Sequence, residues 1–199
     1  MINRKISSLS HEGWRKVRSK YCNASNFDLV ARTENLLLIK GVLDSVGLRF
    51  WLSNGTALAA GRENDWIPWD DDVDIDVLEE EFRLVFDEVV SRFLDAGFIV
   101  RQEYRINRTK LGLVRKKEKS SLRALFLDKS YKNNKYRLRK SYKYPKRFFT
   151  NESTIDFKGS SFLVPNTLKD YLIYVYGDKW YKPIKSDDES KYSTRRIRR

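Results

Sequence analysis

The hydrophobic positions between residues 28 and 46 recur at helical spacing. They lie on a single stripe and comprise Leu29, Leu36, Ile39, Leu43 and Val46. Asn26 or Ser25 can cap the start of this helix, and Gly47 follows its end. The pattern predicts a helix that buries one face against the core.

A second helix is predicted over residues 79–94, where the apolar spacing is the most regular in the chain. Its apolar face comprises Phe82, Val85, Phe86, Val89, Val90, Phe93 and Leu94. Three glutamates at residues 79–81 open the helix, where negative charge stabilises the N-terminus, and Gly97 follows its end. A further helix is predicted over residues 168–176, ending at Gly177.

Short runs of apolar and β-branched residues between these helices predict strands. The strands are expected at residues 48–52, 73–77, 98–104, 111–115, 122–127, 155–157 and 162–164. The segment Ser53–Thr56 is expected to form a turn into a short helix over residues 57–60. Because no repeat or linker interrupts this alternation, we expect an α/β (α+β) fold with a mixed β-sheet flanked by helices.

The composition predicts a single domain in an intracellular protein. A chain of 199 residues with 41% hydrophobic residues can bury one core, so we expect a single domain over residues 1–192 and a disordered basic tail over 193–199. The single cysteine, Cys22, excludes an internal disulfide, and the single histidine, His11, argues against a histidine-dependent triad. No apolar run approaches the roughly 20 residues of a membrane span, so we expect a soluble cytoplasmic protein.

The net charge of +13 is unevenly distributed. Residues 51–100 hold three basic and thirteen acidic side chains, whereas residues 101–147 hold eighteen basic and three acidic ones. The basic segment predicts an anionic partner, such as a glycan or other anionic polymer, a nucleic acid or the anionic inner face of a membrane. A solvated basic face explains it about as well. We expect Lys116, Lys117 and Lys119 to affect partner affinity rather than chemistry.

Five of the seven residues from Asp70 to Asp76 are aspartates, which repel one another unless a cation is bound or some are protonated. Residues two apart on a strand share a face, so Asp72 and Asp74 can direct their oxygens at one Mg²⁺ or Mn²⁺ ion. The alternative is a solvated acidic strand at the edge of the sheet.

The turn that precedes this strand adds a second signal. Asn54, Gly55 and Thr56 lie between a strand and a helix, where backbone N–H groups and a hydroxyl can bind a phosphate. Together with the paired aspartates, this gives the strand, turn, helix and strand arrangement of nucleotidyltransferase-fold enzymes, with phosphates between the turn and the metal.

These segments resemble a known family. The stretch Phe50–Leu58 with Arg62, followed by Ile67–Ile75, is similar to the signature of the LicD family, which includes bacterial phosphocholine transferases and the fukutin and fukutin-related ribitol-phosphate transferases. The similarity returns at 157–165 and 171–183. The resemblance implies a nucleotidyltransferase-like fold, a CDP-linked donor, and transfer of phosphocholine or an alditol phosphate to a glycan hydroxyl of lipopolysaccharide or capsule, with release of CMP.

The resemblance also assigns roles to residues. It implies that Asp72 and Asp74 bind the metal and that Gly55 and Thr56, with Asn54, contact phosphate. It implies further that Asp70 or its neighbour Asp71 positions or deprotonates the acceptor hydroxyl. Arg62 matches a basic residue expected to meet the donor phosphate.

One departure from the family pattern concerns a third carboxylate on a later strand. The best-matching position holds Arg123, and Asp128 is the nearest acid that can act as the third metal ligand. If the strand over 122–127 lies beside the aspartate strand, Arg123 can pair with Asp70, Asp76 or a donor phosphate.

Two other functions remain open from the sequence. The same turn and aspartate pair occur in nucleotidyltransferases that act on RNA or protein. Arg123 in place of an acid is also consistent with a non-catalytic relic that binds glycan or nucleic acid.

Overall fold

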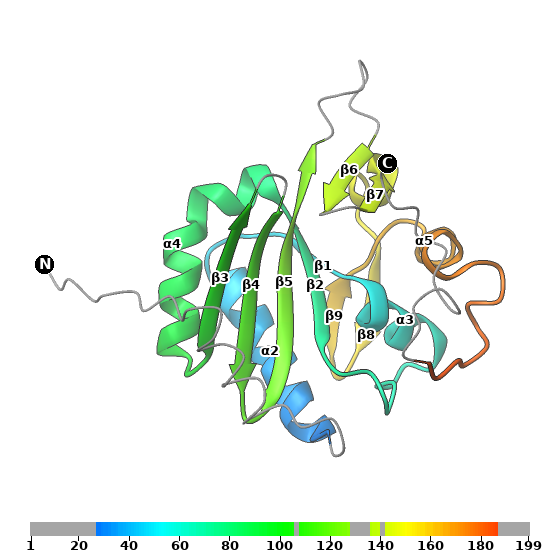
Figure 1. Ribbon diagram of the computed structural model, residues 1–199, viewed down its shortest axis with the longest axis horizontal. Coiled ribbons are helices and arrows are strands. Elements are labelled where there is room, and N and C mark those ends of the chain that lie inside the picture. Colours follow the sequence, from blue (N-terminus) through cyan, green and yellow to red (C-terminus); the bar gives the residue numbers. More distant parts are fainter. Residues whose placement is uncertain (1–26, 106–107, 128–135, 140–141, 187–199) are drawn as a thin grey trace, which may run out of the picture.

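The computed structural model describes residues 27–105, 108–127, 136–139 and 142–186, which fold around one mixed sheet (Figure 1). Its helices are α2 (Leu29–Ser45), α3 (Asn54–Arg62), α4 (Glu79–Asp95) and α5 (Leu168–Tyr176), with a 3₁₀ turn η1 (Lys146–Phe149). Its strands are β1 (Phe50–Leu52), β2 (Val73–Leu78), β3 (Ile99–Arg105), β4 (Arg108–Arg115), β5 (Glu118–Leu127), β6 (Tyr136–Arg139), β7 (Tyr142–Pro145), β8 (Thr154–Phe157) and β9 (Ser160–Leu163). The predicted fold class, a mixed sheet flanked by helices, is confirmed.

The aspartate strand β2 lies in the middle of this sheet. The strand order is β3-β4-β5-β2-β1-β9-β8, with β6 paired to both β5 and β7. β2 runs antiparallel to β1 and parallel to β5, and all six of its residues are buried. The alternative of a solvated acidic edge strand is therefore wrong.

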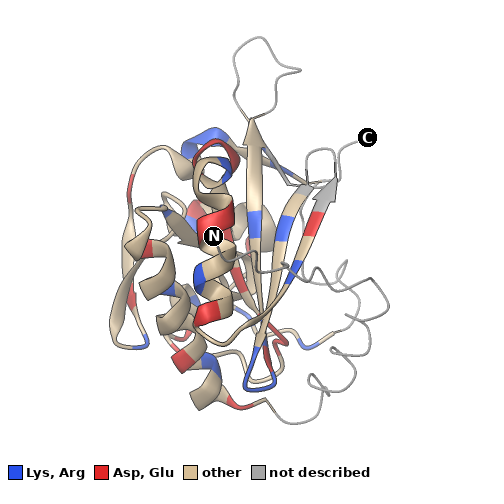
Figure 2. Ribbon diagram, turned by 90° about the vertical axis from the view of Figure 1, so that its left-hand side faces the viewer, with Lys and Arg blue, Asp and Glu red and all other residues tan. Residues whose placement is uncertain are grey.

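Helices α2 and α4 cover one face of the sheet (Figures 1 and 2). The Lys40 ammonium of α2 lies over the ring of Phe50, so Phe50 and its register partner Val77 face these helices. Successive strand residues point to opposite faces, so Asp74 and Asp76 point to the other face. That face carries the polar side chains described below.

Both long helices follow the predicted periodicity. α4 buries Phe82, Val89, Val90 and Phe93, and its first turn holds the three glutamates. Leu94, which was predicted on the same face, is instead exposed in the last turn of the helix. α2 begins after Asp28, whose side chain accepts a hydrogen bond from the Ala31 amide. Asp28 is therefore the N-cap in place of Asn26 or Ser25, which lie outside the described residues.

Aromatic residues in and around the basic segment form part of the core. Tyr144, Phe148 and Phe149 are buried and pack around Tyr171 of α5, with ring centroids 5.5–6.4 Å apart. Phe149 also contacts Trp51 of β1 edge-on at 5.8 Å. The segment from β6 to η1 thus attaches α5 to the central strands. The spacing of Lys and Arg gave no indication of this role.

The described elements share one hydrophobic core, which extends from α2 to α5. The domain limits of 1–192 remain a prediction, and the basic tail at 193–199 lies outside the described residues. Within the described part of the chain, no helix is both long and apolar enough to span a bilayer.

Candidate active site

The N-terminus of α3 lies directly beside the aspartates. The helix begins at Asn54, so the predicted turn is its first turn. Asn54 has a positive φ of 40°, and its amide donates to the Tyr171 hydroxyl at 3.1 Å. The Ser53 amide donates to the carbonyl of Asp74 at 3.0 Å. These bonds fix the start of α3 against β2 and α5.

Gly55 leaves room for the carboxylate of Asp70. A Cβ atom at Gly55 would lie 2.0 Å from Asp70 Oδ2, so any side chain there would displace that carboxylate. The Gly55 amide donates to Asp74 Oδ2 at 3.4 Å. Two carboxylates therefore face the positive end of the α3 dipole, where negative charge is stabilised.

Thr56 connects the same turn to the aspartate strand. Its Oγ1 accepts a hydrogen bond from the Asp74 amide at 2.8 Å, and Thr56 is buried. Thr56 therefore holds β2 in register with α3, a role that adds to its predicted place beside phosphate.

Three carboxylates converge just before β2. Oxygens of Asp70, Asp71 and Asp72 lie within 4.8 Å of one another. Asp72 Oδ2 accepts from the Ser121 hydroxyl at 2.9 Å, and Lys119 Nζ lies 2.5 Å from Asp71 Oδ2 and 3.9 Å from Asp72 Oδ2. The loop thus presents an oxygen-rich surface next to the N-terminus of α3.

The environment separates the pKa values of these acids. Burial, together with the neighbouring charges of Asp72, Asp74 and Asp71, raises the pKa of Asp70 to about 8. Burial also disfavours ionisation of Asp72, but Lys119 and Arg123 outweigh it and keep the pKa of Asp72 below its usual range. Asp70 therefore holds a proton at neutral pH in the metal-free protein, whereas Asp72 is charged.

These residues suit a hard divalent cation. Mg²⁺ and Mn²⁺ prefer oxygen donors, and a cation would relieve the repulsion that raises the pKa of Asp70. The carboxylates of Asp70, Asp71 and Asp72 form the tight group, and Asp74 adjoins it with one oxygen near the Gly55 amide. The tight group thus contains the predicted ligand Asp72 but not Asp74, and the joint binding of a metal by Asp72 and Asp74 remains a prediction. Asp128, the predicted third ligand, lies outside the described residues.

Arg123 projects into this site. The parallel pairing of β5 with β2 places Arg123 opposite Asp76, as the sequence suggested for adjacent strands. Its guanidinium lies 2.5 Å from Asp74 Oδ1 and 3.3 Å from Asp76 Oδ1, and it also donates to the Ser53 hydroxyl at 3.3 Å. Asp76 is fully buried, so Arg123 neutralises a charge that water does not reach.

Arg62, by contrast, lies in the last turn of α3, opposite to the end that faces the aspartates. Its Nε donates to Glu63 Oε1 at 2.9 Å. The described contacts do not join Arg62 to the carboxylates, and its predicted contact with donor phosphate remains a prediction.

Arg32 holds the acidic loop, residues 70–72, by a hydrogen bond to its backbone and was missed by the sequence analysis. It is fully buried; its Nη1 donates to the carbonyl of Asp70 at 2.8 Å and its Nε donates to Glu118 Oε2 at 2.8 Å. Glu118 Oε1 also accepts from the Asp28 amide at 2.8 Å. A signal was present, because Arg32 falls on the apolar stripe of α2 between Leu29 and Leu36, where a charged residue needs a buried partner.

Two lysines of the basic segment also belong to the site. Lys119 contacts Asp71 and so lies beside the acidic residues, and its expected effect on partner affinity rather than chemistry remains a prediction. Lys110 of β4 lies opposite Arg123 in the sheet and faces the same side. Lys116 instead pairs with Glu34 at the surface. The pairing of the strands decides which of these lysines lie at the site, and the local sequence pattern does not reveal that pairing.

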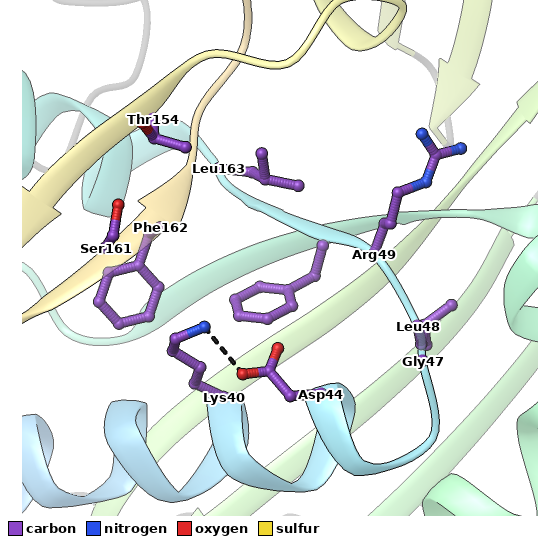
Figure 3. A pocket seen from close by; sticks show the side chains of 10 residues that line it. Lys40, Asp44, Gly47, Leu48, Arg49, Thr154, Ser161, Phe162 and Leu163 are labelled. Atoms are coloured by element: carbon purple, nitrogen blue, oxygen red, sulfur yellow. Dashed lines mark hydrogen bonds and ion pairs between the residues drawn. The ribbon is translucent and has the colours of Figure 1, made fainter.

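A separate hollow of about 370 Å³ lies on the helix-covered face (Figure 3). Lys40 and Asp44 of α2, Arg49 and Phe50 near the start of β1, and Phe162 of β9 are among the residues that line it. It shares no lining residue with the acidic loop. The carboxylates, rather than this hollow, are therefore the candidate active site.

Comparison with protein families agrees with this geometry. A family model described as LicD/FKTN/FKRP, nucleotidyltransferase domain, matches residues 47–167, more than half of the chain. The match includes the α3 N-terminus, the acidic loop and the strands from β1 to β9.

Curated relatives match over shorter stretches. The ribitol 5-phosphate transferase FKRP of mouse and of human is 43% identical over 53 residues, which cover 27% of this chain and 11% of the relative. Human ribitol-5-phosphate transferase FKTN is 31% identical over 71 residues, or 36% of this chain and 15% of the relative. An uncharacterized protein of Rickettsia prowazekii is 28% identical over 100 residues, which cover 50% of this chain and 35% of the relative. The matches thus span only a small part of the FKRP and FKTN chains.

Among solved structures, the antibiotic-resistance factor ANT(2'')-Ia has a similar fold. A solution structure of that protein aligns with a TM-score of 0.50 and 13% identity, covering 69% of this chain and 66% of that chain. At this identity the likeness concerns the fold alone.

Proposed function

Because the chain belongs to the LicD/FKTN/FKRP nucleotidyltransferase domain family, we propose that it is a metal-dependent phosphotransferase. It transfers a phospho-alcohol, such as ribitol phosphate or phosphocholine, from a CDP-linked donor to a hydroxyl of a glycan. The activity for which FKRP and FKTN are named, ribitol 5-phosphate transfer, supports the phospho-alcohol.

One observation carries the proposal: the acidic loop and the N-terminus of α3 face each other. Gly55 approaches Asp70 so closely that no side chain fits between them, and its amide points at Asp74. Carboxylates that bind a cation and backbone amides that bind an anion thus occupy one site. A metal-bound diphosphate needs both kinds of group.

The acidic residues would hold Mg²⁺ or Mn²⁺. Asp72 and Asp74 are the proposed principal ligands, with Asp70 and Asp71 beside them. The bound ion would neutralise charge on the donor phosphates and make phosphorus easier to attack.

The remaining steps are assigned to the chain itself. The first turn of α3, residues 54–56, binds a donor phosphate, and the Gly55 amide exchanges Asp74 for a phosphate oxygen. Asp70 accepts the proton of the acceptor hydroxyl as the oxygen of that hydroxyl attacks phosphorus. The new bond is a phosphodiester, and the bond to CMP breaks so that CMP leaves. Arg123 exchanges a carboxylate for a phosphate oxygen as charge develops.

The acceptor is proposed to be a glycan or another anionic polymer. Exposed basic residues such as Lys116, Lys117 and Arg147 would attract it. The same basic residues would bind the protein to the anionic inner face of a membrane, on the cytoplasmic side. Two functions compete with this proposal. The chain could be a nucleotidyltransferase that acts on RNA or protein, or a non-catalytic relic that binds glycan or nucleic acid.

Nucleotide binding separates these functions. We expect the wild type to bind CDP more tightly than ATP in titration calorimetry, and only in the presence of Mn²⁺. Gly55→Ala should weaken CDP binding by about 10-fold or more, because its Cβ displaces Asp70. Gly41→Ala is the matched control, since nothing lies within 4 Å of its Cβ position.

Preference for ATP over CDP would favour a nucleotidyltransferase instead. Binding of CDP that is equal with and without Mn²⁺ would contradict metal dependence. Equal effects of Gly55→Ala and Gly41→Ala would place the nucleotide elsewhere.

A further inference from the structure

A row of charged side chains crosses the face of the sheet opposite to α2 and α4. Register pairs Glu103 of β3 with Lys110 of β4, Lys110 with Arg123 of β5, and Arg123 with Asp76 of β2. Adjacent strands lie about 4.8 Å apart, so Lys110 and Arg123 are direct neighbours. Figure 2 shows basic positions side by side on these strands.

Lys110 is a partly buried cation beside another cation. Burial lowers its pKa, and the charge of Arg123 lowers it further. Its cross-strand neighbour Glu103 forms an ion pair with Arg101 at 3.0 Å. Among the described residues, no carboxylate lies within ion-pair distance of the Lys110 ammonium; Asp72, Asp74 and Glu103 attract it from farther away.

This arrangement contrasts with the other cations of the site. Lys119 pairs with Asp71, and Arg123 pairs with Asp74 and Asp76. Two adjacent cations with limited access to water cost free energy unless an anion lies between them. The lysine is thus positioned for an anion that comes from outside the chain.

We infer that Lys110 and Arg123 form a binding site for a phosphate group of the nucleotide donor. The inference rests on the proposed function and adds a residue to it. A phosphate held by these two cations would lie next to the aspartates that are proposed to bind the metal. Its other oxygens could then reach the metal, while Lys110 and Arg123 bind the charge on the side away from α3.

The test measures CDP binding in the presence of Mn²⁺ by titration calorimetry. Lys110→Gln should weaken CDP binding by about 10- to 100-fold, because a charge-assisted hydrogen bond to phosphate is lost. Lys110→Arg should stay within about threefold of the wild type, since it keeps the charge. Lys169→Gln, at an exposed lysine of α5, is the matched control and should leave CDP binding unchanged.

Two further readouts exclude a structural role for Lys110. The melting temperature of Lys110→Gln should equal or exceed that of the wild type, because the substitution removes one of two adjacent cations. Mn²⁺ affinity without nucleotide should not fall. A lower melting temperature together with weaker Mn²⁺ binding would overturn the inference, as would unchanged CDP binding.

The failure of the proposed function would look different. If the wild type bound no CDP, inorganic pyrophosphate would serve as the probe of the anion site. If the wild type binds pyrophosphate and Lys110→Gln does not, the anion site is supported although the protein binds no nucleotide. Pyrophosphate binding that is absent, or equal in both proteins, would overturn the site itself.

Discussion

Replacing Arg32 by methionine is expected to lower the free energy of unfolding by about 3–5 kcal/mol. Arg32 is fully buried and Glu118 is 4% exposed, so the substitution leaves a carboxylate inside the protein without its cation. It also removes the donor to the Asp70 carbonyl. Chemical denaturation followed by circular dichroism measures the loss.

Arg92→Met provides the control. Arg92 pairs with Glu88 on the exposed side of α4, where an ion pair contributes about 0.5 kcal/mol or less. Equal losses in the two variants would contradict a special role for the buried pair.

The double variant Arg32→Met/Glu118→Leu separates stability from function. It replaces both charges with apolar side chains and should recover most of the lost stability. Mn²⁺ binding should stay weaker than in the wild type, because the Asp70 carbonyl still lacks its donor. Full recovery of Mn²⁺ affinity would mean that Arg32 supports only the fold.

Asp70→Asn is expected to stabilise the metal-free protein, most strongly at pH 8. The pKa of Asp70 is about 8 in the folded protein, above the value of 3.8 for an unperturbed aspartate. Its contribution to stability is therefore complete below pH 3.8 and is lost as the pH rises to about 8. Asparagine does not titrate, so the gain in melting temperature should grow from pH 5 to pH 8 and reach about 4 °C or more.

Asp87→Asn, on the exposed side of α4, should show no such pH dependence. Mn²⁺ should reverse the order of the melting temperatures, because it stabilises the wild type through the carboxylate that the variant lacks. Identical melting curves for wild type and Asp70→Asn at both pH values would contradict the crowding of carboxylates around Asp70.

The parts of the site that are local in sequence could be predicted from it. The turn at residues 54–56 and the aspartates at 70–76 are each a few consecutive residues, and strand alternation places the side chains of Asp74 and Asp76 on one face. The apolar periodicity of α4 likewise predicted its buried face. Where the hydrophobic pattern alone determines the structure, prediction and structure agree.

The cations of the site depend on contacts between distant segments. Lys119 contacts Asp71 and Lys110 lies beside Arg123 because β4 and β5 pair next to β2. The register of that pairing is not encoded in either strand alone. The number of Lys and Arg residues in a segment therefore does not distinguish residues of the site from surface residues such as Lys116. The predicted position of Arg123 was correct because it was argued from a specific pairing of two strands.

The most direct test of the account measures release of CMP from CDP-ribitol by the purified protein, with Mn²⁺ and a glycan acceptor, using liquid chromatography. We expect Mn²⁺-dependent release by the wild type and a loss of about 1,000-fold or more in Asp72→Asn/Asp74→Asn. Equal release by wild type and double variant would contradict the account. So would a wild type that is inactive until Arg123→Asp supplies a third carboxylate, because the chain would then be a relic of an enzyme.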